Sequence, residues 1–126
     1  MDLTFMKTPS CLVVRVSGEL DLSSAARFRD LIDNELRKTA APNVVVNLKN
    51  LSFVDSTGLG VILGRHKTVT SWGGKFILSD VAPKVSSMLE MAGLLPVLQV
   101  ARTEEDAIKR VKGKDAKAEE AKRYEQ

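Results

Sequence analysis

Short apolar runs rich in β-branched residues alternate along this chain with segments in which apolar residues recur every three or four positions. Runs of the first kind are typical of buried strands, and segments of the second kind are typical of amphipathic helices. Strands that alternate with helices are joined by crossover connections, which place the strands parallel in one sheet. The order therefore predicts an α/β fold, with a central mixed, mostly parallel sheet of four to five strands and about four helices.

Strands are expected at four apolar runs, preceded by a short partner strand that contains Leu3 and Phe5. The first run alternates so that Arg15 points away from the apolar residues, which is typical of a strand buried on one face only. Pro96 cannot donate a backbone hydrogen bond, so it predicts an edge position for the last run. The four runs cover residues 12–16, 44–48, 75–78 and 95–100.

Four helices are expected, and three of them carry signals at their first residues. Ser23 or Ser24 is expected to cap the first helix, Pro83 suits the first turn of the third, and Thr103 is expected to cap the last. Acidic residues follow Thr103, which is the favourable charge at a helix N-terminus. The expected helices cover residues 25–38, 57–71 and 83–92 and a segment that begins at residue 104.

The chain has 126 residues, enough for one domain with a core of its own. Residues 1–112 hold the periodic segments and are expected to form that domain, whereas residues 113–126 are charged, without an apolar face, and are expected to form a flexible tail. The net charge of +3 falls on residues 1–103, because acidic and basic side chains balance in residues 104–126. A scattered excess interleaved with acids argues against nucleic-acid binding.

Cysteine and histidine are nearly absent, which limits the chemistry open to the chain. Cys11 is the only cysteine and His66 the only histidine, so neither a disulfide nor a metal cluster is expected. The N-terminus lacks the pattern of a signal peptide, and no apolar run is long enough to cross a membrane. A cytoplasmic protein without cofactor, metal or membrane partner is therefore expected.

The junction between the second apolar run and the second helix is the most unusual segment. It reads Asp55-Ser56-Thr57-Gly58-Leu59-Gly60, and each glycine costs a helix about 1 kcal/mol relative to alanine. Hydroxyl groups beside glycines at the positive end of a helix suit the docking of a partner or the binding of a phosphate. The alternative is that Asp55 or Ser56 is only the N-cap and that the glycines relieve packing against the sheet.

A Ser-His mechanism at Ser56 is excluded by the position of the only histidine, and although Asp55 could in principle act as a base, no oxyanion-type constellation accompanies it in the sequence. His66 lies ten residues further along the same expected helix, about 15 Å away at the rise of an α-helix, so it cannot act as the base. The segment lacks the lysine of a phosphate-binding P-loop, and Asp80 and Glu90 are isolated in sequence. No catalytic residue is expected, and a small nucleotide-binding or hydrolytic protein is kept as an alternative.

Residues 53–65, which read Phe-Val-Asp-Ser-Thr-Gly-Leu-Gly-Val-Ile-Leu-Gly-Arg, resemble the phosphorylation segment of bacterial anti-sigma factor antagonists. These are small members of the STAS (sulfate transporter and anti-sigma factor antagonist) family. The segments Gly18-Glu19-Leu20-Asp21 and Met91-Ala92-Gly93-Leu94 resemble two further stretches of the family, and the likeness covers residues 3–111 in order. The continuation Gly-Val-Ile-Leu-Gly-Arg is similar to that of the sporulation antagonists of the anti-sigma F kinase.

The resemblance implies a STAS-like fold and a regulatory protein that switches partners rather than an enzyme. In the family, the unphosphorylated antagonist binds an anti-sigma factor that is itself a serine kinase, and the sigma factor is freed. The kinase phosphorylates the antagonist with ATP, and a metal-dependent serine phosphatase removes the phosphate. An alternative of the same fold is an interaction module of a general stress or stressosome-type assembly.

By position, the resemblance makes Ser56 the phosphate acceptor, with Thr57 as a second hydroxyl. Asp21 matches a loop aspartate of the family that lies near the acceptor and the kinase interface; the alternative is that it is only an acid placed near the start of the first helix. The protein is expected to be a monomer or a weak dimer. The residues expected to contact the partner are Asp21, Asp55, Ser56, Thr57, Gly58 and Gly60.

Overall fold

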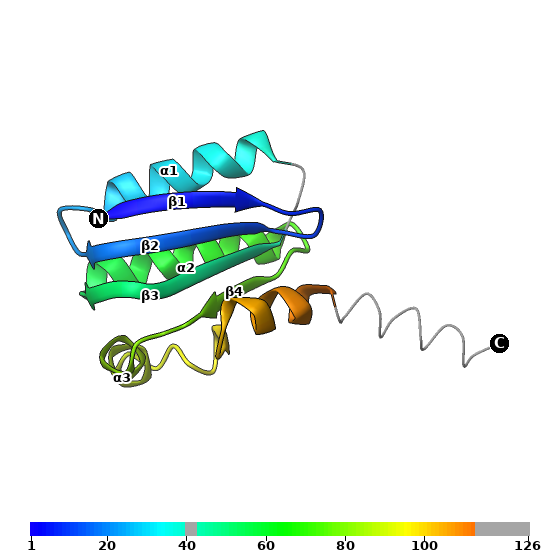
Figure 1. The fold of residues 1–126 in the computed structure, drawn as a ribbon. Helices are drawn as coiled ribbons and strands as arrows, with labels where there is room; N and C mark the ends of the chain where they lie inside the picture. Colours follow the sequence, from blue (N-terminus) through cyan, green and yellow to red (C-terminus); the bar gives the residue numbers. More distant parts are fainter. Residues whose placement is uncertain (40–42, 113–126) are drawn as a thin grey trace.

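The computed structural model describes residues 1–39 and 43–112 of the chain (Figure 1). In these two ranges one sheet contains five strands, in the order β1-β2-β3-β4-β5. β1 runs antiparallel to β2, and every other neighbouring pair is parallel, so the predicted mixed, mostly parallel sheet is confirmed. The strands are β1 (Asp2–Lys7), β2 (Leu12–Leu20), β3 (Val44–Val54), β4 (Phe76–Ser79) and β5 (Gln99–Ala101).

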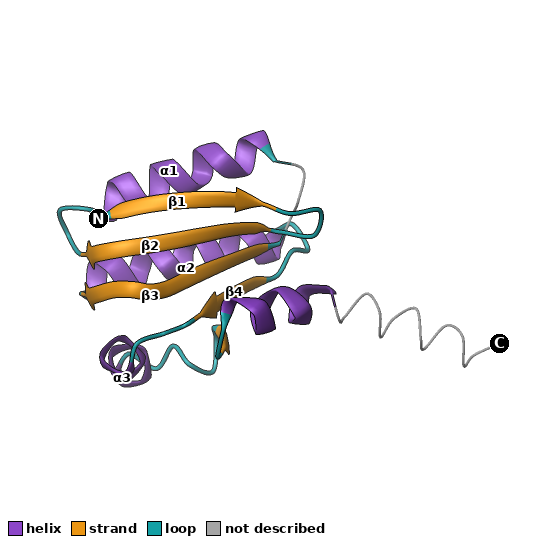
Figure 2. Cartoon of the chain, in the orientation of Figure 1, coloured by secondary structure: helices purple, strands orange, loops and turns teal. Residues whose placement is uncertain are grey.

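Within the described residues four helices accompany the sheet, as predicted. Figure 2 shows the helices in purple beside the orange strands. Three are α1 (Ala25–Lys38), α2 (Ser56–Ser71) and α3 (Pro83–Met91), and a C-terminal helix covers residues 104–112. Thr103 caps that last helix, because its hydroxyl oxygen accepts a hydrogen bond of 3.1 Å from the Asp106 N–H. The expected tail over residues 113–126 lies outside the described residues, so it stays a prediction.

The two faces of the sheet are covered differently. α1, α2 and α3 bury Phe28, Ile62 and Leu89 against one face in the larger apolar cluster. The C-terminal helix packs Ala107 on the opposite face in a smaller cluster that includes Val13. The sequence predicted that β2 is buried on one face only, which is wrong for its first half, because the C-terminal helix covers Val13 completely.

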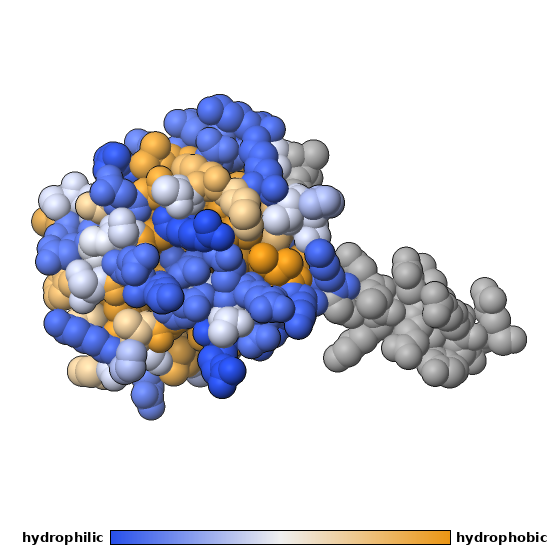
Figure 3. All heavy atoms as spheres, in the orientation of Figure 1, coloured by the Kyte–Doolittle hydropathy of each residue, from blue (hydrophilic) through white to orange (hydrophobic). Residues whose placement is uncertain are grey.

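Beyond the C-terminal helix, the second face of the sheet is polar and open. Figure 3 shows hydrophilic side chains gathered over this face. Nε and Nη2 of Arg15 each donate a hydrogen bond of 2.9 Å to the Glu104 carboxylate, which also accepts one from Asn47. These contacts lower the pKa of Glu104, with the Arg15 hydrogen bond as the largest cause, and they tie the C-terminal helix to the sheet.

β3 is longer than the predicted strand over residues 44–48 and leads directly into α2. Polar residues interrupt its apolar pattern, but Leu51 and Val54 are buried and pair in register with Gly18 and Leu20 of β2. Two register shifts in the β2–β3 pairing accommodate the irregular pattern. The strand therefore ends next to the carboxyl end of β2 and delivers the chain to Asp55.

The last strand is shorter than the predicted one over residues 95–100. The N–H groups of Val97 and Leu98 donate to the Leu94 carbonyl at 3.0 and 2.9 Å, so this stretch forms a local turn. Pro96 has no N–H for a sheet, and β5 begins only at Gln99. The predicted edge position is confirmed, since β5 ends the strand order.

Candidate functional site

The candidate site lies where the carboxyl ends of β2 and β3 meet. β2 leads there into the loop before α1, and β3 leads into α2 (Figure 1). The Asp55 N–H donates a hydrogen bond of 3.2 Å to the Leu20 carbonyl, which joins the two strand ends. The residues around positions 21 and 55 are 34 positions apart in the sequence but adjacent in the fold. The structure thus brings together two of the three sequence segments that carry the resemblance, residues 18–21 and residues 53–65.

Asp55 is the N-cap of α2, as one interpretation of the sequence proposed. Its Oδ1 accepts a hydrogen bond of 2.8 Å from the Gly58 N–H. Its Oδ2 accepts a second hydrogen bond, of 3.0 Å, from the Leu22 N–H in the β2–α1 loop. One carboxylate therefore holds two segments of the site together, and we call this pair of hydrogen bonds the Asp55 clamp.

Ser56 and Thr57 open α2 with free hydroxyl groups. Within the described residues neither side chain has a hydrogen-bond partner, and neither backbone N–H is bonded. Ser56 is exposed, whereas Thr57 is half-buried. Unpaired N–H groups carry the positive end of the helix dipole, so a negative group attached to Ser56 would be stabilised there.

The two glycines of the segment occupy opposite environments. Gly58 is buried, and a Cβ built on it would lie 2.2 Å from the Leu20 carbonyl oxygen and 2.8 Å from a methyl group of Val54. At Gly60 a Cβ would meet nothing within 4 Å, and the residue is exposed. Packing against the sheet therefore explains Gly58, while Gly60 leaves the surface of α2 open.

Asp21 organises the β2–α1 loop. Its Oδ1 accepts hydrogen bonds from the Ser23 N–H at 3.0 Å, the Ser24 N–H at 3.2 Å and the Ser23 hydroxyl at 2.6 Å. The bond from the Ser23 hydroxyl is the largest cause that lowers the pKa of Asp21. Ser24 is the N-cap of α1, one of the two residues predicted, but its hydroxyl donates to the Glu19 carbonyl and makes no capping bond.

Leu22 is a member of the site that the sequence analysis did not single out. Its side chain is 77% exposed, although its backbone is held by Asp55. The sequence signal that could have pointed to it is an apolar residue between Asp21 and Ser23, in a segment whose composition is typical of a turn. An apolar side chain is thus displayed beside the start of α2.

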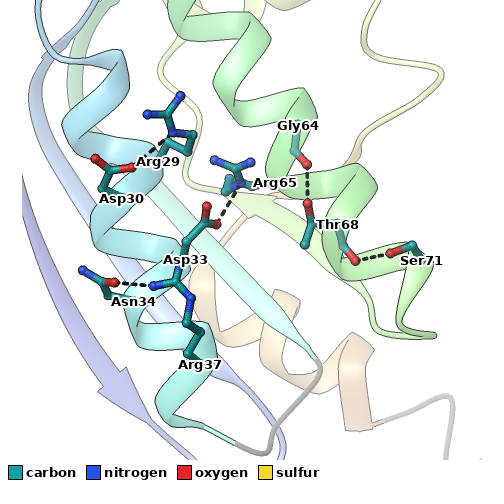
Figure 4. Close-up of polar contacts among 9 residues, drawn as sticks. All are labelled: Arg29, Asp30, Asp33, Asn34, Arg37, Gly64, Arg65, Thr68 and Ser71. Carbon is teal, nitrogen blue, oxygen red and sulfur yellow. Dashed lines mark hydrogen bonds and ion pairs between the residues drawn. The ribbon is translucent and has the colours of Figure 1, made fainter.

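The far part of α2 belongs to the core and not to the site. Arg65 Nε lies 3.2 Å from Asp33 Oδ1 of α1, and Figure 4 shows this ion pair spanning the two helices. His66 packs edge-on against Phe76, with ring centroids 5.8 Å apart. Burial, followed by the charge of Lys67, lowers the pKa of His66. His66 thus packs on the face of α2 that meets Phe76 and lies away from Ser56, in agreement with the predicted separation.

The described residues contain no group of three or more His, Cys, Asp or Glu side chains able to hold a metal ion. None of the helices described for residues 1–39 and 43–112 has the length and apolar character needed to cross a membrane.

Comparison with known proteins places this chain in a family. The STAS domain family matches residues 3–107. The anti-sigma F factor antagonist of Paenibacillus polymyxa is 40% identical over 97 residues, which cover 77% of this chain and 83% of that protein. The structure of the anti-sigma factor antagonist SpoIIAA in its unphosphorylated form is similar, with a TM-score of 0.75, 34% identity, and coverage of 89% of this chain and 97% of that one.

A second structure, of the Bacillus cell fate determinant SpoIIAA in the phosphorylated form, has a TM-score of 0.67 and 33% identity, and the match covers 87% of this chain and 99% of that one. The fold, the matched residues and these relatives agree with the resemblance carried by residues 53–65. The chain belongs to the STAS domain family.

Proposed function

We propose that this protein is an anti-sigma factor antagonist that acts by partner switching, with Ser56 as its phosphate acceptor. In its unphosphorylated form it binds an anti-sigma factor that is a serine kinase, and the sigma factor is released. Phosphorylation of Ser56 ends the binding, and a serine phosphatase restores it. The observation that supports this proposal best is the exposed, unpartnered Ser56 hydroxyl at the start of α2.

The surroundings of Ser56 favour it over Thr57 as the acceptor. Both hydroxyls are free of hydrogen bonds within the described residues, but only Ser56 is exposed. Thr57 is also β-branched, so its side chain has fewer conformations with which to enter a kinase active site. The open surface at Gly60 leaves room for the kinase to approach the first turns of the helix.

A phosphate on Ser56 would act on docking and not on folding. It adds about 1.5 to 2 negative charges beside the Asp55 carboxylate. In the free protein the start of α2 faces solvent, and its unpaired N–H groups favour a negative charge. In a complex the same charges would be moved out of water against the partner, which opposes binding by an amount on the order of several kcal/mol.

Incubation of the purified chain with an anti-sigma factor serine kinase and ATP tests the proposal. We expect one phosphate, mapped by mass spectrometry to Ser56, and release of the chain from the kinase. Ser56→Ala should stay folded, bind the kinase and take up no phosphate. A phosphate on Thr57 with Ser56 unmodified would overturn the assignment.

The same experiment separates the two alternatives. A chain that binds its partner but is not released by ATP is an interaction module of another assembly. A chain that hydrolyses ATP without any partner is an enzyme, which contradicts the proposal.

A further inference from the structure

Leu22 combines high exposure with a rigid backbone. An apolar side chain that is 77% exposed gains nothing from the fold of this chain. Flexible loops often display such side chains, but the turn over residues 21–24 is held by several hydrogen bonds to Asp21. Its backbone is tied further, since the Asp21 carbonyl accepts from both Ser24 and Ala25. The backbone therefore holds the Leu22 Cα in one position before any partner arrives.

The Asp55 clamp fixes that position relative to the acceptor. Oδ2 of Asp55 binds the Leu22 N–H at 3.0 Å, while Oδ1 binds the Gly58 N–H at 2.8 Å. Ser56 follows Asp55 directly in the chain. The loop and the first turn of α2 are thus joined through a single carboxylate, which holds the backbone of Leu22 beside the start of the helix that carries Ser56.

We propose that Leu22 is an apolar anchor for the kinase partner, and that Asp55 is the positioning residue that sets it. The inference rests on the proposed function, and it adds that the partner carries an apolar pocket beside the site that receives the Ser56 hydroxyl. A preorganised anchor strengthens binding because little conformational entropy is lost when it docks. Buried apolar anchors also carry much of the energy of protein interfaces.

Truncation of the Leu22 side chain tests whether this residue is an anchor for the kinase. Leu22→Ala should raise the dissociation constant of the complex with the kinase about ten- to a hundredfold, the change expected when the burial of one leucine side chain is lost. Trp72→Ala is the matched control, because Trp72 is 57% exposed at the opposite end of α2, about 24 Å along the helix. This control should bind as the unmodified chain does.

Asp55→Asn tests the positioning role of Asp55, because it keeps the capping bond to Gly58 and removes the bond to Leu22. Asparagine is as good an N-cap as aspartate, and its Oδ1 can still accept from the Gly58 N–H. Its amide group then turns a donor toward the Leu22 N–H, which is also a donor. We expect faster hydrogen exchange at the Leu22 amide and weaker kinase binding at nearly unchanged thermal stability. Asp55→Ser, which keeps a capping oxygen and loses the second acceptor, should behave in the same way.

A double-mutant cycle distinguishes positioning from general damage. If Asp55 acts through Leu22, the double variant Leu22→Ala/Asp55→Asn should bind no more weakly than the worse of the two single variants. Additive losses would overturn the positioning role, and a Leu22→Ala variant with unchanged affinity would overturn the anchor. Failure of the proposed function gives a different result, since the unmodified chain would then neither bind the kinase nor accept phosphate.

Discussion

The two ends of α2 treat their hydroxyl groups in opposite ways. In the last turns, the hydroxyl groups of Thr68, Thr70 and Ser71 each donate to a backbone carbonyl of the preceding turn, at 3.0, 2.8 and 2.7 Å. Figure 4 shows the bonds from Thr68 to Gly64 and from Ser71 to Thr68. At the first turn, Ser56 and Thr57 have no preceding turn of helix that could supply a carbonyl.

The position of a hydroxyl group in α2 thus decides whether it is hydrogen-bonded to the backbone or free to react with a partner. Hydroxyl groups late in α2 are used by the backbone, whereas those at its start are free and lie where the helix favours negative charge. The same amino acid is therefore a structural residue at position 71 and a candidate for modification at position 56.

The largest expected effect comes from removing one serine from each end of the helix. Ser56→Ala should abolish phosphate uptake from the kinase, while Ser71→Ala should be phosphorylated at the normal rate, because only Ser56 has a free and exposed hydroxyl. Phosphate uptake is measured by intact-mass spectrometry. A phosphate on the Ser56→Ala variant would contradict the proposed difference between the two ends of α2.

The glycines give the next largest effect. Gly58→Ala places a Cβ against the Leu20 backbone and should lower the free energy of unfolding by about 3 kcal/mol, at the upper end of the cost of overpacking. At Gly60 a Cβ meets no atom within 4 Å. Gly60→Ala should therefore raise the free energy of unfolding by about 0.5–1 kcal/mol, because alanine favours the helix. Urea denaturation measures both, and equal changes of the same sign would show that the two environments do not differ.

Gly64 is the matched control for Gly60. A Cβ at Gly64 also meets nothing within 4 Å, so Gly64→Ala should stabilise the fold by a similar amount. If Gly60→Ala weakens kinase binding more than Gly64→Ala does, the loss reports contact with the partner and not stability. Equal affinities for the two variants would remove Gly60 from the docking surface.

Loss of the ion pair between Asp33 of α1 and Arg65 of α2 should change the stability of the fold without changing kinase binding. Asp33→Ala leaves Arg65, whose side chain is only 12% exposed, without its ion-pair partner. A buried charged donor that loses its partner should cost about 2 kcal/mol of unfolding free energy. Kinase affinity should stay unchanged at a temperature where the variant is folded. A loss of affinity there would show that docking extends along the whole helix.

The smallest expected effect depends on pH and lies far from the acceptor. The folded state lowers the pKa of Glu104, mainly through its hydrogen bond from Arg15, so this stabilisation is present above the ordinary value of 4.5. It is lost as the pH falls through the lowered pKa of the folded state. Glu104→Gln should therefore flatten the acid side of the stability curve by less than about 1 kcal/mol, as thermal unfolding at several pH values will show.

The regular elements could be predicted from the sequence because their patterns are local. The apolar periodicity of residues 25–38 matches α1, and the short β-branched run at residues 44–46 marks the start of β3. The continuation of β3 to Val54 was missed, since its polar positions become understandable only when β2 lies beside them. The same holds for Val13, whose burial depends on a helix nearly a hundred residues later in the chain.

At the site, the sequence located the segment and its candidate residues, but it did not reveal their tertiary contacts. Asp55 was recognisable as a possible N-cap, but its second hydrogen bond, to Leu22, depends on the approach of a distant loop. The two glycines look alike in sequence, and only the neighbouring Leu20 carbonyl distinguishes them. Local patterns therefore located the segment, whereas the surroundings of each residue depend on tertiary contacts.

The central claim is that a phosphate on Ser56 controls docking. The most direct test is the dissociation constant of the kinase for the chain before and after stoichiometric phosphorylation at Ser56, measured by isothermal titration calorimetry. We predict that phosphorylation weakens binding at least about a hundredfold, as expected for charge moved into a desolvated interface. Equal affinities for the two forms, with the phosphate confirmed on Ser56, would contradict it.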